Sequence, residues 1–229
     1  MDRKTQLTFL WFGPAMAVLF GLAFVGLAGM VPPPGPSLSA VQVADFYAAH
    51  PLEIGVAMVI ILMAMGMLAP WASVLALRLR RVEGKYPVLM VSQLINIAVA
   101  VTIVVLCPIF WAAAAFRAGD TSPDVVRALN DVAFIIFLAP WPPFSFWIWA
   151  MSWAILADRS ATPEFPRWVA FLGLGVGVLF LPAALVMVLK KSVFAWDGIF
   201  GFYVPLTAFF SWLVAVTVYA MRGVRRETD

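Results

Sequence analysis

The feature that most limits how this chain can fold is a series of six long apolar stretches. They cover residues 7–30, 52–77, 88–116, 132–157, 168–189 and 198–221. About 20 apolar residues are enough for an α-helix to cross the roughly 30 Å hydrocarbon core of a bilayer. Backbone groups find no water inside lipid, so a segment that crosses it must satisfy its own hydrogen bonds. The sequence therefore predicts an all-α integral membrane protein, a bundle of six transmembrane helices.

Composition places the whole chain in the same class. Of its 229 residues, 64% are hydrophobic and 12% are charged, whereas about 25% of residues are charged in an average soluble domain. The first stretch follows Arg3 and Lys4, as in a signal peptide. Its apolar run is longer than the usual core of roughly 7–15 residues, and no small-residue cleavage site follows it. We expect a retained helix, and one membrane domain over residues 1–229 surrounded by the lipid bilayer.

The distribution of basic residues predicts the orientation. Eleven of the fifteen Lys and Arg residues lie in the N-terminal segment, the second and fourth loops and the C-terminal segment. Loops 31–51, 117–131 and 190–198 hold the other four. Because Lys and Arg near helix ends remain on the cytoplasmic side, we expect both termini in the cytoplasm of a bacterial cell and these three loops outside. The pI near 9.3 is then an orientation signal, and we expect no nucleic-acid partner.

Two of the external loops carry signals for a helix start. In the first loop, Ser37 or Ser39 can cap a short helix that Pro51 would end. In the third loop, Ser122 is placed as a cap and Pro123 at the first helical position. We expect the second of these helices to continue directly into the fourth span.

The fourth span contains a cluster of helix breakers. Residues 138–153 read LAPWPPFSFWIWAMSW, in which Pro140, Pro142 and Pro143 each remove an amide donor and clash with the carbonyl four residues earlier. We therefore predict a proline-broken fourth helix whose second half begins near Phe144. Unpaired backbone groups cost several kcal/mol in hydrocarbon, so the break should face a polar spot inside the protein. Each other span also carries a proline, which predicts kinks throughout: Pro14, Pro70, Pro108, Pro182 and Pro205.

Aromatic and hydroxyl side chains follow the break on separate faces of the helix. At about 100° per residue, Phe146, Trp149 and Trp153 share one face, and Ser145 and Ser152 share another. The aromatic face can line a pocket for an apolar ligand. Alternatively, tryptophan rings of this kind fill gaps between helices or lie at the membrane interface.

Polar residues elsewhere in the membrane provide further candidates. Ser92, Gln93 and Asn96 lie three and four residues apart on one helix face, where they can bind a polar ligand group or join helices. Asp131, at the outer entrance of the fourth span, is either functional or a hydrated boundary residue. Gly173 and Gly177 form a GxxxG pair that predicts close helix packing. The candidate ligand-binding residues are Ser92, Gln93, Asn96, Asp131, Trp141, Ser145, Trp149, Ser152 and Trp153.

The chain offers little for catalysis. Its single histidine, His50, lies in a loop, and its single cysteine, Cys107, lies in an apolar run. Haem ligand pairs, di-iron histidine boxes and zinc motifs all need more such residues. We expect no catalytic residue, no metal site and no cofactor.

Two hypotheses for function remain. The first is that the protein binds or transports a small apolar or amphipathic molecule in an aromatic cavity between the fourth span and spans three and six. The second is that it is a non-catalytic subunit or assembly factor, whose aromatic and glycine faces contact a membrane-protein partner or a second copy. Inward tryptophans around a central void favour the first, and an outward aromatic stripe favours the second.

Reporter fusions test the orientation. Fusions after the second and fourth loops should report a cytoplasmic location, and fusions within the first, third and fifth loops an external one, because of the unequal distribution of basic residues. An external second loop would contradict the topology.

Overall fold

Six helical spans form the bundle, as the sequence predicts. The structure is a computed structural model that describes residues 2–227, and it contains no strand over that part of the chain. Six helical segments are long and apolar enough to cross a membrane: Arg3–Leu27, Pro51–Glu83, Val88–Arg117, Pro123–Ala157, Arg167–Met187 and Ile199–Arg226. These bounds contain most of each predicted stretch. The prediction of an all-α bundle of six spans is therefore confirmed.

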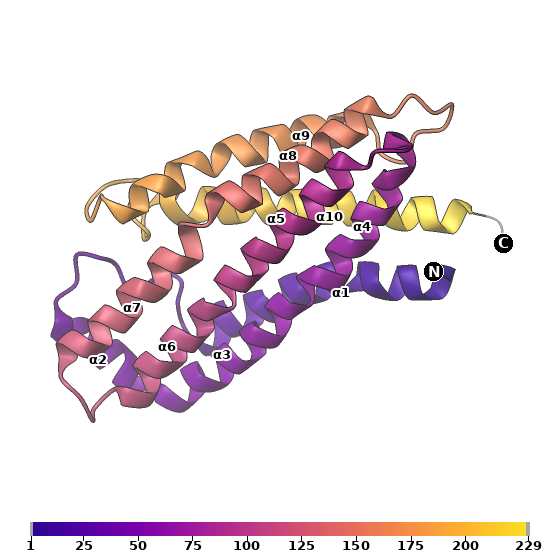
Figure 1. Cartoon of the computed structure of the whole chain (residues 1–229). Coiled ribbons are helices and arrows are strands. Elements are labelled where there is room, and N and C mark those ends of the chain that lie inside the picture. The colour runs from indigo at the N-terminus through magenta and orange to yellow at the C-terminus, as the bar shows by residue number, and fades with distance from the viewer. Residues whose placement is uncertain (1, 228–229) are drawn as a thin grey trace.

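The two ends of the bundle differ. Both chain termini lie at one end, which we call the terminal end, together with the α4–α5 and α8–α9 loops (Figure 1). The short helix α2 (Ala40–Ala49) lies at the other end, which we call the α2 end (Figure 1). Within the bundle, α8 packs mainly against α9 and α5, α6 against α7, and α1 against α10.

Every span consists of two helical pieces. The first span is α1 (Arg3–Gly21) and a π-helical turn, η1 (Leu22–Leu27), and the second is α3 (Pro51–Gly66) and α4 (Leu68–Glu83). The third is α5 (Val88–Val104) and α6 (Leu106–Arg117), and the fourth is α7 (Pro123–Leu138) and α8 (Trp141–Ala157). The fifth is α9 (Arg167–Leu179) and a 3₁₀ helix, η2 (Leu181–Met187), and the sixth is a π-helical turn, η3 (Ile199–Tyr203), and α10 (Val204–Arg226).

The breaks in the second and third spans have a common cause in the sequence. Met67 separates α3 from α4 and lies three residues before Pro70. Val105 separates α5 from α6 and lies three residues before Pro108. A proline cannot donate to the carbonyl four residues earlier, and its ring clashes with that carbonyl. The regular helix is therefore interrupted between the two residues. By contrast, α1 continues through Pro14 without interruption.

The fourth span is broken where its sequence predicts. Helix α7 ends at Leu138 and α8 begins at Trp141, three residues earlier than expected. Pro142 and Pro143 therefore lie in the first turn of α8, where amide groups have no acceptor within the helix in any case. Three prolines thus interrupt the span while removing few hydrogen bonds.

The helix starts in the loops follow their predicted caps. Ser39, and not Ser37, caps α2: its hydroxyl accepts a hydrogen bond from the Gln42 amide, and the Gln42 side chain accepts one from the Ser39 amide. Pro51 is the first residue of α3, so it both follows the end of α2 and starts the next helix. Ser122 and Pro123 occupy the predicted positions at the start of α7, but the Ser122 side chain makes no capping hydrogen bond.

The GxxxG pair lets α9 approach α8 closely. A Cβ atom at Gly173 would overlap the Ser152 hydroxyl, and one at Gly177 would overlap the indole of Trp149. Polar contacts complete this interface, since the Ser145 hydroxyl donates to the Gly177 carbonyl at 2.9 Å. The predicted close packing at the glycine pair is therefore present.

A glycine substitution series tests this packing. Gly177→Ala should destabilise the protein by about 1–3 kcal/mol because the rigid Trp149 ring must move to admit the new methyl group. Gly175 lies on the same helix with no heavy atom near a Cβ in that position, so Gly175→Ala is the matched control and should be neutral or slightly stabilising. Unfolding of the purified variants in detergent, followed by circular dichroism, measures both. Equal losses would contradict the packing role of Gly177.

Candidate functional site

A cavity of about 100 Å³, open in part to the outside of the bundle, lies at the level where the spans are interrupted. Met65 and Leu68, on either side of the break at Met67, line it from the second span. Val104, which immediately precedes the break at Val105, lines it from the third span. The cavity is therefore located beside the places where two helices are interrupted.

The remaining spans reach the same cavity, also near their breaks. Pro140 and Trp141 line it from the fourth span, and Phe180, which joins α9 to η2, lines it from the fifth. Pro205 lines it from the first turn of α10, and the first span contributes Phe20. The sequence predicted a cavity bounded by spans three, four and six, whereas all six spans surround this one.

The lining is apolar, contrary to the polar spot expected at the proline cluster. Among the lining side chains, the indole of Trp141 is the only one that carries a polar atom. The expectation was wrong because the break is short: the Ala139 amide still donates to the Ile135 carbonyl at 2.8 Å, and α8 starts again two residues later. Few backbone groups at the break are left without a hydrogen-bond partner, so apolar side chains can line the cavity there.

Two aromatic clusters adjoin the cavity on opposite sides. Toward the terminal end, Trp71, Trp147 and Trp212 meet edge to face, with ring centroids 5.2–6.1 Å apart. Toward the α2 end, the Phe24 ring lies 5.2 Å from that of Phe20 and 5.5 Å from that of Trp111. Such ring pairs contribute about 0.5–1.5 kcal/mol each beyond simple burial, so the walls on both sides are firmly packed.

Of the nine candidate ligand-binding residues, Trp141 lines the cavity. Three others face α9: Ser145 donates to the Gly177 carbonyl, the Trp149 indole donates to the Leu174 carbonyl at 3.2 Å, and Ser152 donates within its own helix. Trp153 is 61% exposed on the outside of the bundle. The structure thus places the hydroxyl face of α8 against a neighbouring helix and part of its aromatic face outward.

The polar residues of α5 do not meet the cavity either. The Asn96 side chain donates to the Ser92 carbonyl at 2.9 Å and to the Ser92 hydroxyl at 3.3 Å, one turn earlier in the same helix. Gln93 is completely buried, and within residues 2–227 its amide group has no hydrogen-bond partner. These residues share a helix face as expected, but the bonds of Asn96 are local.

Asp131 belongs to a polar chain near the α2 end that the sequence did not reveal. The Tyr47 hydroxyl of α2 donates to the Asn130 side chain at 2.9 Å, and Asn130 in turn donates to Asp131 at 3.2 Å. Burial raises the pKa of Tyr47, so its hydroxyl remains a hydrogen-bond donor at neutral pH. This contact holds α2 over the entrance of the fourth span.

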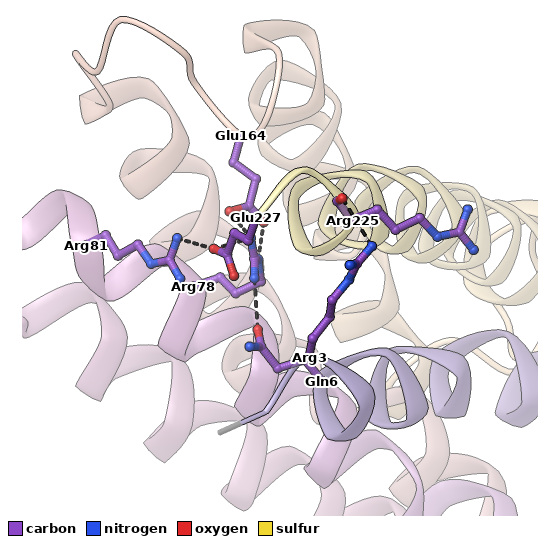
Figure 2. Close-up of polar contacts among 7 residues, drawn as sticks. All are labelled: Arg3, Gln6, Arg78, Arg81, Glu164, Arg225 and Glu227. Atoms are coloured by element: carbon purple, nitrogen blue, oxygen red, sulfur yellow. Dashed lines mark hydrogen bonds and ion pairs between the residues drawn. The ribbon is translucent and has the colours of Figure 1, made fainter. Parts of the chain in front are cut away.

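A cluster of charged residues closes the terminal end and was also missed (Figure 2). Arg78, only 4% exposed, donates through Nε and Nη2 to both carboxylate oxygens of Glu164. It also donates to Gln6 at 2.8 Å and to Glu227 at 3.4 Å, and Arg81 binds the same Glu227. Figure 2 shows these side chains converging from α1, α4, the α8–α9 loop and the end of α10. The sequence did not reveal this cluster, because a basic residue near the end of a span, such as Arg78, is also what the membrane orientation requires.

The pKa values of the two carboxylates in this charge cluster are shifted in opposite directions. Burial raises the pKa of Glu164, although Arg78 opposes the shift. The hydrogen bond from Arg81 lowers the pKa of the more exposed Glu227. The Arg78–Glu164 pair is therefore the desolvated part of the cluster, where the loss of one partner leaves an uncompensated charge.

Comparison with known proteins adds no relative. No family model, no curated protein and no solved structure matches this chain. The features that bear on function are therefore the cavity at the helix breaks and the polar contacts at the two ends of the bundle.

Substitution of Arg78 tests the charge cluster. Arg78→Met should cost about 2–4 kcal/mol of stability, somewhat less than the loss of one partner from a fully buried pair, because it leaves the partly buried Glu164 carboxylate unpaired. Adding Glu164→Gln should recover part of that loss. Arg81, whose side chain is 62% exposed, provides the control, and Arg81→Gln should cost less than about 1 kcal/mol. Unfolding of the purified proteins in detergent gives these values, and an equal cost for Arg78 and Arg81 would exclude a special role for the buried pair.

Proposed function

We propose that the protein binds, and helps to move, a small apolar or amphipathic molecule in the cavity at the helix breaks. The observation that carries this proposal is the apolar cavity of about 100 Å³, lined by all six spans where their helices are interrupted. An ordinary packed bundle has few voids of this size, because protein interiors are as dense as organic crystals.

The size and lining of the cavity favour an apolar occupant. Apolar cavities of about 150 Å³ in other proteins stay dry and accept benzene or xenon. A cavity of about 100 Å³ suits a small ring or the end of a hydrocarbon chain. Trp141 supplies one indole N–H, which can donate to a polar group at the edge of an otherwise apolar ligand.

The breaks around the cavity support movement as well as binding. At the breaks next to a proline the helix lacks part of its hydrogen-bond ladder, so the two halves can tilt relative to each other more easily than a continuous helix can bend. Polar contacts join the helices at both ends of the bundle: the Tyr47–Asn130 bond at the α2 end and the Arg78–Glu164 pair at the terminal end, which we expect to face the cytoplasm. Separating one of these contacts at a time would let the bundle open toward one side.

One observation favours the alternative role as a subunit of a membrane complex. Phe146 and Trp153 on α8 are 52% and 61% exposed, and Phe171 on α9 is 62% exposed. Outward aromatic side chains can contact a partner helix as well as lipid. The alternative predicts that a protein partner, and no small molecule, copurifies with the protein.

Native mass spectrometry of gently extracted protein tests the proposal. The wild type should carry a small-molecule adduct, and Ala183→Phe should lose it, because Ala183 lines the cavity and the larger ring would occupy that space. Leu185→Phe is the matched control, since Leu185 lies in the same η2 segment, is 37% exposed and does not line the cavity.

The three outcomes differ clearly. Loss of the adduct in Ala183→Phe alone supports binding in the cavity. Retention of the same adduct in both variants would falsify this location. A protein partner without any small molecule would favour the subunit role.

A further inference from the structure

A second hollow lies at the terminal end, separate from the cavity at the helix breaks. It is a cleft of about 380 Å³ between the end of α8, the α8–α9 loop, the start of α9 and the end of α10. Three arginines line it: Arg167, Arg222 and Arg226. We propose that this cleft binds the phosphate-bearing headgroup of an anionic phospholipid.

The charges of the cleft favour an anion. Its two acidic residues are Asp158 and Glu164. Both carboxylate oxygens of Glu164 accept hydrogen bonds from Arg78, which lies outside the cleft lining, and one oxygen of Asp158 accepts from the Ser160 amide at 2.9 Å. Over residues 2–227, none of the three lining arginines forms an ion pair. The acids are therefore engaged and the arginines are available.

One arginine is already held in a position suited to a phosphate. The Arg222 guanidinium lies 5.2 Å from the centre of the Tyr219 ring, and Trp168 packs edge-on against the same ring at 5.8 Å. A guanidinium held against an aromatic ring loses less freedom on binding, and its N–H groups lie in the plane of the group. Those groups match two oxygens of one phosphate.

The position of the cleft favours a lipid over a soluble phosphate. It lies at the ends of three helices that are long and apolar enough to cross a membrane, where headgroups are found. Apolar side chains, Ile155 and Phe165, lie beside the arginines, and Trp168, at the start of α9, is 49% exposed, as is typical of residues at the membrane interface. Basic pockets between transmembrane helices on the cytoplasmic side attract anionic headgroups.

The charge cluster fixes one wall of the cleft. Glu164 packs so closely against α10 that a Cβ at Gly223 would lie 2.6 Å from the Glu164 Cδ atom. The bond to Arg78 on α4 holds the same side chain from the other direction (Figure 2). These two contacts fix the position of Glu164 in the loop beside Arg167 and Arg222. The cleft is therefore preformed.

Lipid titration of the purified protein tests the proposal. Phosphatidylglycerol should raise the Tm in detergent and remain bound in native mass spectra, whereas phosphatidylcholine, whose headgroup has no net charge, should do neither. The variant Arg167→Gln, Arg222→Gln, Arg226→Gln should bind phosphatidylglycerol on the order of 100-fold more weakly, since each arginine near an anionic surface contributes about fivefold.

A matched control separates the cleft from general surface charge. Lys4→Gln, Arg80→Gln, Arg225→Gln removes the same number of charges from the same end of the protein, outside the cleft lining. This variant should lose less than about threefold in affinity, because screened charges act over short distances. Equal losses in the two triple variants would overturn the proposal. Inorganic phosphate that stabilises the wild type as strongly as phosphatidylglycerol would overturn the assignment to a lipid.

Discussion

The structure depends on one constraint, that backbone hydrogen bonds inside a membrane must be made within the protein. Prolines act directly on this constraint, because each removes a donor that lipid cannot replace. In the second, third and fourth spans the helix is interrupted about three residues before a proline, at Met67, Val105 and Ala139. These breaks adjoin one common cavity, lined largely by aromatic and aliphatic side chains.

Much of this fold could be predicted from the sequence because the relevant signals are local. Apolar length defines six spans, and Ser39 and Pro123 mark helix starts through their own backbone chemistry. The proline rule locates the breaks of the second to sixth spans within a few residues, but not the change from α1 to η1 in the first span. The start of α8 at Trp141, earlier than Phe144, follows from the tolerance of a first helical turn for prolines.

The site was harder to predict, because its parts come from distant segments. Trp141 could be found since it lies next to the break, but nothing local indicates that Ser145 turns toward α9 or that Trp153 turns outward. The pairing of Arg78 with Glu164 joins residues 86 positions apart and needs the packed bundle to become visible. Helix periodicity correctly groups residues into faces, but it does not say which neighbour each face meets.

The last helix has a consequence for how the protein is made. Of the three rings in the tryptophan cluster, Trp212 belongs to α10, and α10 also supplies Pro205 and Phe209 to the cavity wall. A chain synthesised from its N-terminus inserts this segment after all the others. Until α10 docks against α1 and α9, the side of the cavity that Pro205 and Phe209 form is missing. The cavity is therefore completed only with the last span, so a chain shortened before α10 would have the breaks of the other spans but no complete pocket beside them.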